Sequence, residues 1–166
     1  MPPAVLIAVG FVAMEPVTYA THRWVMHGPG RRLHRGHHAP RPGSRWQAND
    51  LFPLAFAVVV MAAMAVGFNV AGWAWLVPLC VGVTLYGAAY ALVHDVYAHR
   101  RAPLFRRRHA PLERLATAHA LHHRFGGEPY GMLAPLVPRR LRVATAPGHE
   151  EAVRSGSTPS QVPIEP

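Results

Sequence analysis

Residues 51–93 read LFPLAFAVVVMAAMAVGFNVAGWAWLVPLCVGVTLYGAAYALV, and no charged side chain interrupts them. A helix that crosses a membrane needs about 20 apolar residues. This stretch is therefore long enough for two spans, and the natural turn between them lies at residues 68–72, FNVAG. Pro78 falls within the second of these spans, where membrane helices tolerate a kink. We expect a helical hairpin that crosses a bilayer.

Another apolar stretch, residues 3–20, precedes this hairpin and is interrupted only by Glu15 and Pro16. It has no basic segment before it and no small-residue cleavage pattern after it, so we expect a retained span and not a signal peptide. The predicted fold class is all-α, an integral membrane helical bundle of three to four spans, because a re-entrant segment stays open. Cys80 lies in an apolar run, where we expect a small buried hydrophobe.

Arginine sets the expected topology. All seventeen Lys or Arg residues are arginine, the formal net charge is +9, and the arginines gather after the first span and after the third. An even number of spans between Asp50 and His94 places both groups on one side, which the positive-inside rule makes cytoplasmic. Such basic chains can bind nucleic acid, but here the arginines flank apolar spans. We expect a protein of the cytoplasmic (inner) membrane with no nucleic-acid partner.

Histidine is the most unusual part of the composition. Ten of the twelve histidines form four groups, in which the pattern HxxxxH followed by HxxHH occurs twice. The groups are His22 and His27; His34, His37 and His38; His94 and His99; and His119, His122 and His123. All four groups fall on the arginine-rich side of the predicted spans. His109 and His149 stand alone, and we expect them to be ordinary surface residues.

The HxxHH spacing suits metal binding by a helix. Residues i, i+3 and i+4 cover an arc of about 100°, so each HxxHH group can converge on a small volume. Neutral imidazole is a good ligand for iron, zinc and copper, and ten histidines match two metals with five ligands each. Solvated interfacial histidines are the ordinary alternative, which a repeated pattern confined to one side of the membrane disfavours.

The HxxxxH spacing is harder to reconcile with a regular helix. Five residues turn an α-helix by about 500°, which leaves the two rings about 140° apart. Either the helix end unwinds or bulges there, or each ring serves a different metal. Both pairs fall where a span meets the interface, and Gly28-Pro29-Gly30 after His27 favours an irregular end.

Two acidic residues could support such a site. Glu15 lies inside the first span, seven residues before His22 and on the same face, so it could hydrogen-bond and orient a ligand imidazole. The alternative is that Glu15 pairs with a polar group of a neighbouring helix. Asp95 adjoins His94 and could orient its ring or cap the helix at the interface.

The remainder of the chain is predicted to contain one more helix and a tail. Residues 109–125 are expected to form a helix that Gly126 and Gly127 end. We expect residues 1–145 to form a membrane-embedded di-metal domain with its histidines on the cytoplasmic side. Residues 146–166 are rich in Pro, Ser, Gly and Glu and are expected to be disordered.

The motifs resemble those of the bacterial β-carotene hydroxylases in the fatty acid hydroxylase/sterol desaturase superfamily. Residues 21–28 (THRWVMHG), 93–100 (VHDVYAHR) and 118–123 (AHALHH) match stretches typical of that family, within a resemblance that covers residues 4–138. The order and spacing of all four histidine motifs carry the similarity. Residues 126–135 (GGEPYGMLAP) follow the family's glycine-aromatic pattern only loosely.

The resemblance implies a non-haem di-iron centre that uses O₂ and two electrons supplied by ferredoxin and its reductase. It also implies hydroxylation of β-ionone rings at C3, from β-carotene through β-cryptoxanthin to zeaxanthin. Acid–base groups cannot remove an unactivated ring hydrogen, so a redox cofactor fits this chemistry. Arg106, Arg107 and Arg108 could dock an acidic electron donor, or contact lipid head groups instead.

Other functions stay open at this point. A related superfamily member would act on a sterol or a fatty acyl chain. A membrane metal transporter would carry its ligands near the bilayer midplane, whereas these histidines are expected at or beyond one interface. A zinc peptidase would need an HExxH pairing that the sequence lacks.

Overall fold

The computed structural model describes residues 1–38, 46–105 and 107–143, and this part of the chain is helical with no strand. It divides into one unit, Met1–Leu136, and a second, Val137–Pro166, in which only residues 137–143 are described. The second unit contributes helix α6 (Arg139–Val143). The predicted tail at residues 146–166, and its boundary with a domain of residues 1–145, lie outside the described residues.

The first unit contains every element of the predicted membrane bundle. In chain order these are α1 (Pro3–Ala20), the π-helix η1 (Thr21–Met26), α2 (Arg31–His38), the short 3-10 helix η2 (Ala48–Asp50), α3 (Leu51–Asn69), α4 (Leu76–Ala91), the π-helix η3 (Leu92–Ala98) and α5 (Ala110–Phe125). Three continuous stretches are long and apolar enough to cross a membrane: Pro3–Met26, Ala48–Asn69 and Leu76–Ala98. The predicted fold class is confirmed.

The hairpin turn lies slightly later than predicted. Helix α3 ends at Asn69 and α4 begins at Leu76, and Gly72 supplies a backbone φ of 83° between them. Pro78 is therefore in the first turn of α4 and not in its interior. Because the first N–H groups of a helix have no helical partner, Pro78 breaks no backbone hydrogen bond at this position.

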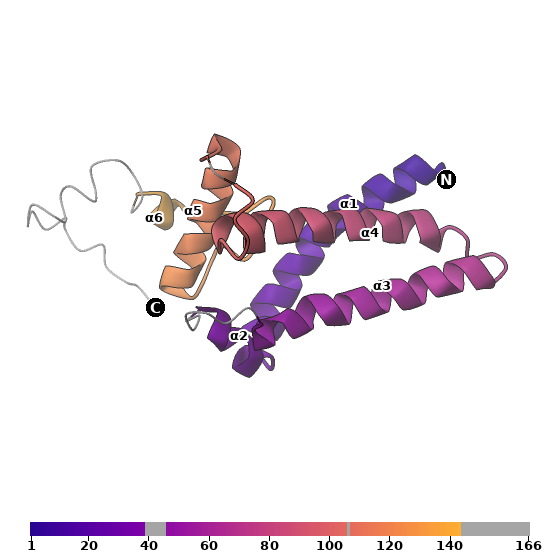
Figure 1. Ribbon diagram of the computed structural model, residues 1–166, viewed down its shortest axis with the longest axis horizontal. Coiled ribbons are helices and arrows are strands. Elements are labelled where there is room, and N and C mark those ends of the chain that lie inside the picture. The colour runs from indigo at the N-terminus through magenta and orange to yellow at the C-terminus, as the bar shows by residue number, and fades with distance from the viewer. Residues whose placement is uncertain (39–45, 106, 144–166) are drawn as a thin grey trace, which may run out of the picture. The chain divides into compact units, whose positions relative to one another are not determined.

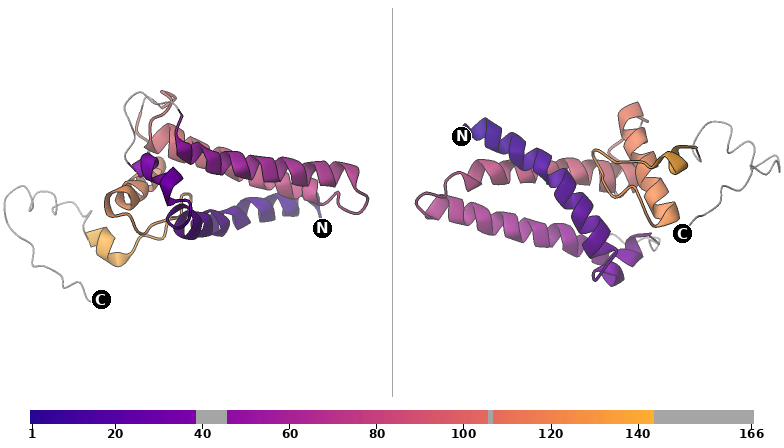
Figure 2. Two further views of the ribbon diagram at one scale, coloured as in Figure 1. Left: turned by 90° about the horizontal axis from the view of Figure 1, so that it is seen from below. Right: turned by 180° about the vertical axis from the view of Figure 1, so that it is seen from behind.

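Two glycines allow α1 and α4 to cross at close range (Figures 1 and 2). A Cβ atom on Gly10 would collide with the carbonyl of Leu79, and one on Gly82 would collide with the carbonyl of Ile7. Small residues at such crossings are typical of membrane helices, whose association depends on close packing because lipid is as apolar as the side chains. Helix α4 follows α3 in the chain and runs back beside it, and the two helices form the predicted hairpin (Figure 1).

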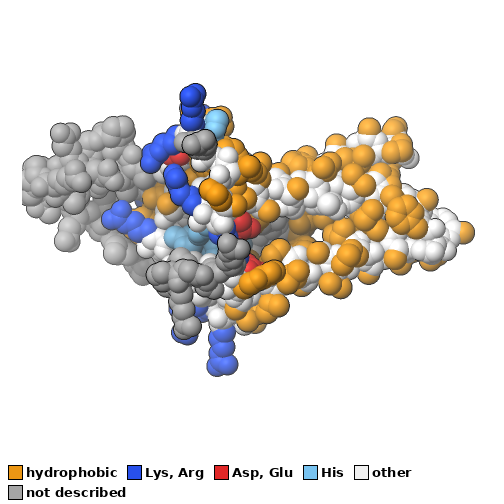
Figure 3. Space-filling view, viewed as in Figure 1, with side chains coloured by type: hydrophobic (Ala, Val, Ile, Leu, Met, Phe, Trp, Pro, Cys, Tyr) orange, Lys and Arg blue, Asp and Glu red, His pale blue; other side chains and the backbone are white. Residues whose placement is uncertain are grey.

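The two ends of the first unit differ in chemistry. Apolar side chains cover the spans, and residues such as Val58 and Val59 are 60% and 66% exposed, as expected of a surface that faces lipid (Figure 3). Helices α2 and α5 lie at the end opposite the α3–α4 turn, where basic and histidine side chains gather (Figures 1 and 3). Gly126, with a φ of 69°, ends α5 as predicted.

Candidate metal centre

The two HxxxxH pairs lie in the π-helical turns at the ends of α1 and α4. The backbone N–H of His27 donates to the carbonyl of His22 at 3.1 Å, and that of His99 donates to the carbonyl of His94 at 2.9 Å. These i→i+5 bonds widen the turn, so the ring centroids lie only 5.2 Å apart in the first pair and 4.7 Å apart in the second. Of the two arrangements that the spacing allowed, the structure has the bulged helix end.

Nine histidines present ring nitrogens in two compact groups, and within each group these atoms lie within 4.8 Å of one another. Cluster A consists of His22, His27, His34, His38 and His122, and cluster B of His37, His99, His119 and His123. The tenth histidine, His94, lies beside cluster B. Its ring centroid is 4.6 Å from that of His119 and 4.8 Å from that of His37. All ten predicted ligands are therefore brought to one end of the spans.

Each HxxHH group is divided between the two clusters. In α2, His34 and His38 belong to cluster A while His37 belongs to cluster B. Helix α5 shows the reverse, since His119 and His123 belong to cluster B and His122 belongs to cluster A. The expectation that each group converges on one volume was wrong. Residues i and i+4 lie about 40° apart around a helix, whereas residue i+3 lies about 100° from i+4 and points to the other cluster.

Three of the five Nδ1 atoms in cluster A contact oxygen atoms that can only accept a hydrogen bond. The pairs are His22 Nδ1 with the Tyr130 carbonyl at 3.0 Å, His34 Nδ1 with Asn49 Oδ1 at 2.8 Å, and His122 Nδ1 with the Gly127 carbonyl at 2.6 Å. Each of these Nδ1 atoms therefore carries the proton. In the neutral ring the Nε2 atom is then a bare lone pair, which is the form that binds a metal.

These Nε2 atoms face one another at distances that suit a metal site. His22 Nε2 lies 3.2 Å from His34 Nε2, and His122 Nε2 lies 3.2 Å from His38 Nε2. The bare lone pairs of His22 and His34 repel each other at this distance unless a cation lies between them. Nitrogen ligands that bind one metal ion at about 2.1 Å and at a right angle are about 3 Å apart, so the residues present fit a bound metal.

Cluster B also contains ring nitrogens that point to a metal. His99 Nε2 lies 2.8 Å from His119 Nε2. The buried Nε2 atoms of His37 and His123 have no hydrogen-bond partner among the described residues. Buried polar atoms are nearly always satisfied in native structures, so these nitrogens also indicate a metal ligand role.

Burial keeps the imidazoles neutral. Desolvation is the largest cause in each case, and it lowers the pKa of His34 and of His99 from 6.5 to about 4. Together with repulsion from neighbouring histidines it lowers the pKa of His122 to about 3 and that of His123 to about 2. At neutral pH these rings are unprotonated and can bind a cation.

The two acidic residues have different partners. Asp95 lies where it was predicted, with Oδ1 at 3.1 Å from His94 Nδ1. Glu15 instead accepts hydrogen bonds from the Tyr86 hydroxyl and from three backbone N–H groups of residues 132–134, and not from an imidazole among the described residues. The predicted contact fails because seven residues advance a helix by about 10 Å, which places His22 beyond the reach of the Glu15 side chain.

Sequence reasoning missed six residues that support the clusters. Asn49 and Gln47 present side-chain oxygens to His34 Nδ1 and His37 Nδ1 at 2.8 and 3.2 Å. Arg101 forms a bidentate ion pair with Asp50 and also contacts Asp95. The polar run QAND immediately before the apolar stretch was the available signal. Tyr130 and Gly127 act through backbone carbonyls, which leave no signature in the sequence.

The predicted donor-docking arginines are only partly described. Arg107 and Arg108 are exposed, and Arg108 lies 3.6 Å from Glu113. Arg106 lies outside the described residues.

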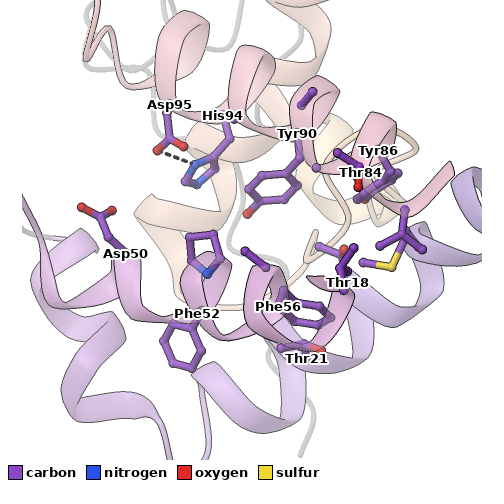
Figure 4. Close-up of a pocket in the computed structure, with 18 of the residues that line it drawn as sticks. Thr18, Thr21, Asp50, Phe52, Phe56, Thr84, Tyr86, Tyr90, His94 and Asp95 are labelled. Carbon is purple, nitrogen blue, oxygen red and sulfur yellow. Dashed lines mark hydrogen bonds and ion pairs between the residues drawn. The ribbon is translucent and has the colours of Figure 1, made fainter. Parts of the chain in front are cut away.

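An apolar cavity of about 580 Å³ lies between α1, α3 and α4 and reaches His94 (Figure 4). Its walls include Phe52 and Phe56 from α3 and Tyr86 and Tyr90 from α4. The Tyr90 ring stacks on His94 with centroids 4.9 Å apart, so the cavity ends at the edge of cluster B. Several lining residues, Met61, Thr84, Gly87 and Ala88 among them, are also exposed on the spans. The cavity therefore opens sideways on the apolar surface.

Three apolar spans with two histidine clusters at one end define a membrane protein with a metal-binding site. The profile of the fatty acid hydroxylase family matches residues 7–140, and the chain belongs to this family. Membership makes the chain an enzyme of the hydroxylase class.

The curated relatives carry related names. The β-carotene hydroxylase of Pseudescherichia vulneris is 42% identical over 125 residues, which is 75% of this chain and 69% of that protein. The chloroplastic β-carotene hydroxylase 1 of Capsicum annuum is 38% identical over 138 residues, 78% of this chain and 42% of that protein. The chloroplastic β-carotene 3-hydroxylase of Haematococcus lacustris is 38% identical over 156 residues, which is 89% of this chain and 47% of that protein. The match thus spans less than half of these two chloroplast proteins. No solved structure matches the chain significantly.

Proposed function

We propose that this chain is a β-carotene 3-hydroxylase of carotenoid biosynthesis. It adds oxygen from O₂ to C3 of a β-ionone ring and converts β-carotene through β-cryptoxanthin to zeaxanthin. The observation that carries the proposal is an apolar cavity, open towards lipid, that ends at His94 beside cluster B, one of the two histidine clusters. The names of the curated relatives, bacterial and chloroplastic, support the substrate.

Ten histidines are the proposed metal ligands. Cluster A would hold one iron ion, and cluster B together with His94 would hold the second. The bound metal pair supplies the redox chemistry that activates O₂, which no side chain in the cavity can provide. In the balanced reaction one oxygen atom enters the ring C–H bond as a hydroxyl group. The other leaves as water, and two electrons and two protons are consumed.

The chain's own residues orient the imidazole rings and shape the cavity. The Tyr130 and Gly127 carbonyls and the Asn49 side-chain oxygen fix which nitrogen is bare in three of the five cluster A rings, those of His22, His122 and His34. Asp95 has the same proposed role for His94, and Arg101 holds that carboxylate in place. The apolar walls of the cavity hold a ring without hydrogen bonds, so shape alone positions C3.

The substrate and the electrons are proposed to arrive from different directions. A C40 hydrocarbon dissolves in the bilayer and can enter through the sideways opening of the cavity. Ferredoxin, reduced by its reductase, would dock on the cytoplasmic face of the inner membrane, where Arg106, Arg107 and Arg108 follow the third span. The positive-inside rule supports this orientation of the histidine end.

Product analysis in a bacterial host that makes β-carotene tests the proposal. Expression of the chain should convert β-carotene to β-cryptoxanthin and zeaxanthin, identified by chromatography and mass spectrometry. The His119→Ala variant, which removes a proposed ligand, should insert in the membrane and form neither product. Unchanged β-carotene with the unaltered, metal-loaded chain would contradict the proposed substrate.

A further inference from the structure

Residues 127–134, which we call the strap, run from the end of α5 back to Glu15 in the second half of α1. The strap has no regular secondary structure, yet Pro129, Gly131 and Met132 within it are buried. A segment of this kind needs partners for its backbone polar groups. Its hydrogen bonds go to cluster A on one side and to α1 on the other.

The strap contacts cluster A at three of its five histidines. Its carbonyl oxygens at Gly127 and Tyr130 accept from His122 Nδ1 and His22 Nδ1, at 2.6 and 3.0 Å. The Tyr130 ring also packs on His22, His27 and His122, with centroids 5.2 to 5.4 Å apart. Within the described part of the chain, the strap makes no hydrogen bond and no ring contact with cluster B.

Glu15 holds the far end of the strap. Its Oε1 atom accepts from the backbone N–H groups of Met132 and Ala134 at 3.0 and 2.9 Å, and its Oε2 atom accepts from that of Leu133 at 3.1 Å. The Tyr86 hydroxyl donates to Oε2 at 2.6 Å and fixes the carboxylate from α4. Three consecutive backbone N–H groups thus donate to one carboxylate inside a membrane span. Burying an ionisable group in a membrane costs free energy, so such a group usually has a function.

Two further observations show how closely the strap is held. A Cβ atom on Gly131 would lie 2.7 Å from Glu15 Oε1, so a larger residue there would displace the carboxylate from its present position. At the other end, Glu128 accepts from the Tyr19 hydroxyl at 2.6 Å and from Arg23 at 2.8 Å. Tyr130 and its carbonyl lie between these two attachments.

We propose that Glu15 is a positioning residue for one metal only, the metal of cluster A. It acts through the strap, whose carbonyls keep His22 and His122 in the tautomer that leaves Nε2 bare. Loss of such supporting groups typically lowers metal affinity about 10- to 100-fold. Cluster B has separate supports in Gln47 and Asp95, so its metal should remain. The inference depends on the proposed two-metal function.

The test counts metal ions per chain in protein purified from membranes. In Glu15→Gln an N–H₂ group replaces one carboxylate oxygen and faces backbone N–H donors, so at least one strap bond is lost. We expect this variant to retain about half of the metal that the unaltered protein retains after the same limited chelator treatment. Gly131→Ala, which displaces the same carboxylate, should behave alike. Glu113→Gln is the matched control, because Glu113 bonds Tyr97 away from the strap, and it should retain the full metal content.

Combined variants identify which metal is lost. Glu15→Gln added to His27→Ala, both acting on cluster A, should lose no more metal than His27→Ala alone. The double variant with Glu15→Gln and His99→Ala, which affects both clusters, should lose both metals. Full retention in Glu15→Gln, or loss of both metals from a helical and monodisperse Glu15→Gln protein, would overturn the proposal. Unaltered protein that binds fewer than two metals would instead contradict the proposed function itself.

Discussion

Gly87 offers the most direct way to test the cavity as the substrate site. It lines the cavity from α4, and a Cβ atom there would have no other heavy atom within 4 Å. A leucine at this position would therefore project into the cavity without displacing the backbone. Glycine has a much lower helix propensity than leucine, so Gly87→Leu should not weaken α4.

The size of the effect follows from how such a substrate binds. β-Carotene comes from lipid, which is as apolar as the cavity, so entry gains little hydrophobic free energy. The site then selects by shape, and one misplaced methylene in an apolar pocket costs about 1–3 kcal/mol, or roughly 10- to 200-fold. A leucine side chain in a cavity of about 580 Å³ should lower kcat/KM for β-carotene by at least about 10-fold.

The assay compares ring hydroxylation by purified Gly87→Leu and unaltered protein, with metal content measured on the same samples. Ala62→Leu is the matched control, since Ala62 is exposed on α3 and does not line the cavity. Metal content should be equal in all three proteins, and only Gly87→Leu should lose activity. Undiminished kcat/KM in Gly87→Leu would show that the ring binds elsewhere.

Three further predictions concern the clusters and the crossing of the spans. His37→Ala and His38→Ala should each lose one metal, and their combination should lose both, because these adjacent residues belong to different clusters; a double variant that keeps one metal would argue against the division. Metal-free protein should lose thermal stability as the pH falls from 6.5 to 5. In this range the unfolded chain takes up protons on His34 and His99, whereas the folded protein does not, because their pKa values in the fold are about 4. The loss is about 2 kcal/mol for each of these two histidines, and a flat melting temperature from pH 7.5 to 5 would refute it. Gly82→Val should reduce the yield of folded protein several-fold, since its side chain would meet the backbone of α1; normal expression and a normal melting temperature would contradict the close crossing.

The spans and the histidine end could be predicted because lipid imposes simple requirements on sequence. Backbone groups in a bilayer must be satisfied within the helix, so an uncharged stretch as long as residues 51–93 must be a hairpin. The spacing of His22 and His27 likewise required either a bulge or two separate sites. The sequence alone does not show which of the two arrangements occurs, because a π-helical turn depends on how the end of the helix packs.

The division of the HxxHH groups could not be predicted from the spacing alone. It depends on α2 and α5 each presenting one histidine, His37 and His122, to the cluster that holds two histidines of the other helix. That arrangement is a property of two helices far apart in the chain. The partners of Glu15 were missed for a similar reason, because the N–H groups that it binds belong to backbone more than a hundred residues away.

Iron content measured on purified, active protein tests the central claim most directly. The two histidine clusters predict two iron ions per chain in protein that forms zeaxanthin in an O₂-dependent reaction. Full activity with a single iron ion per chain, or with zinc in place of iron, would contradict the account.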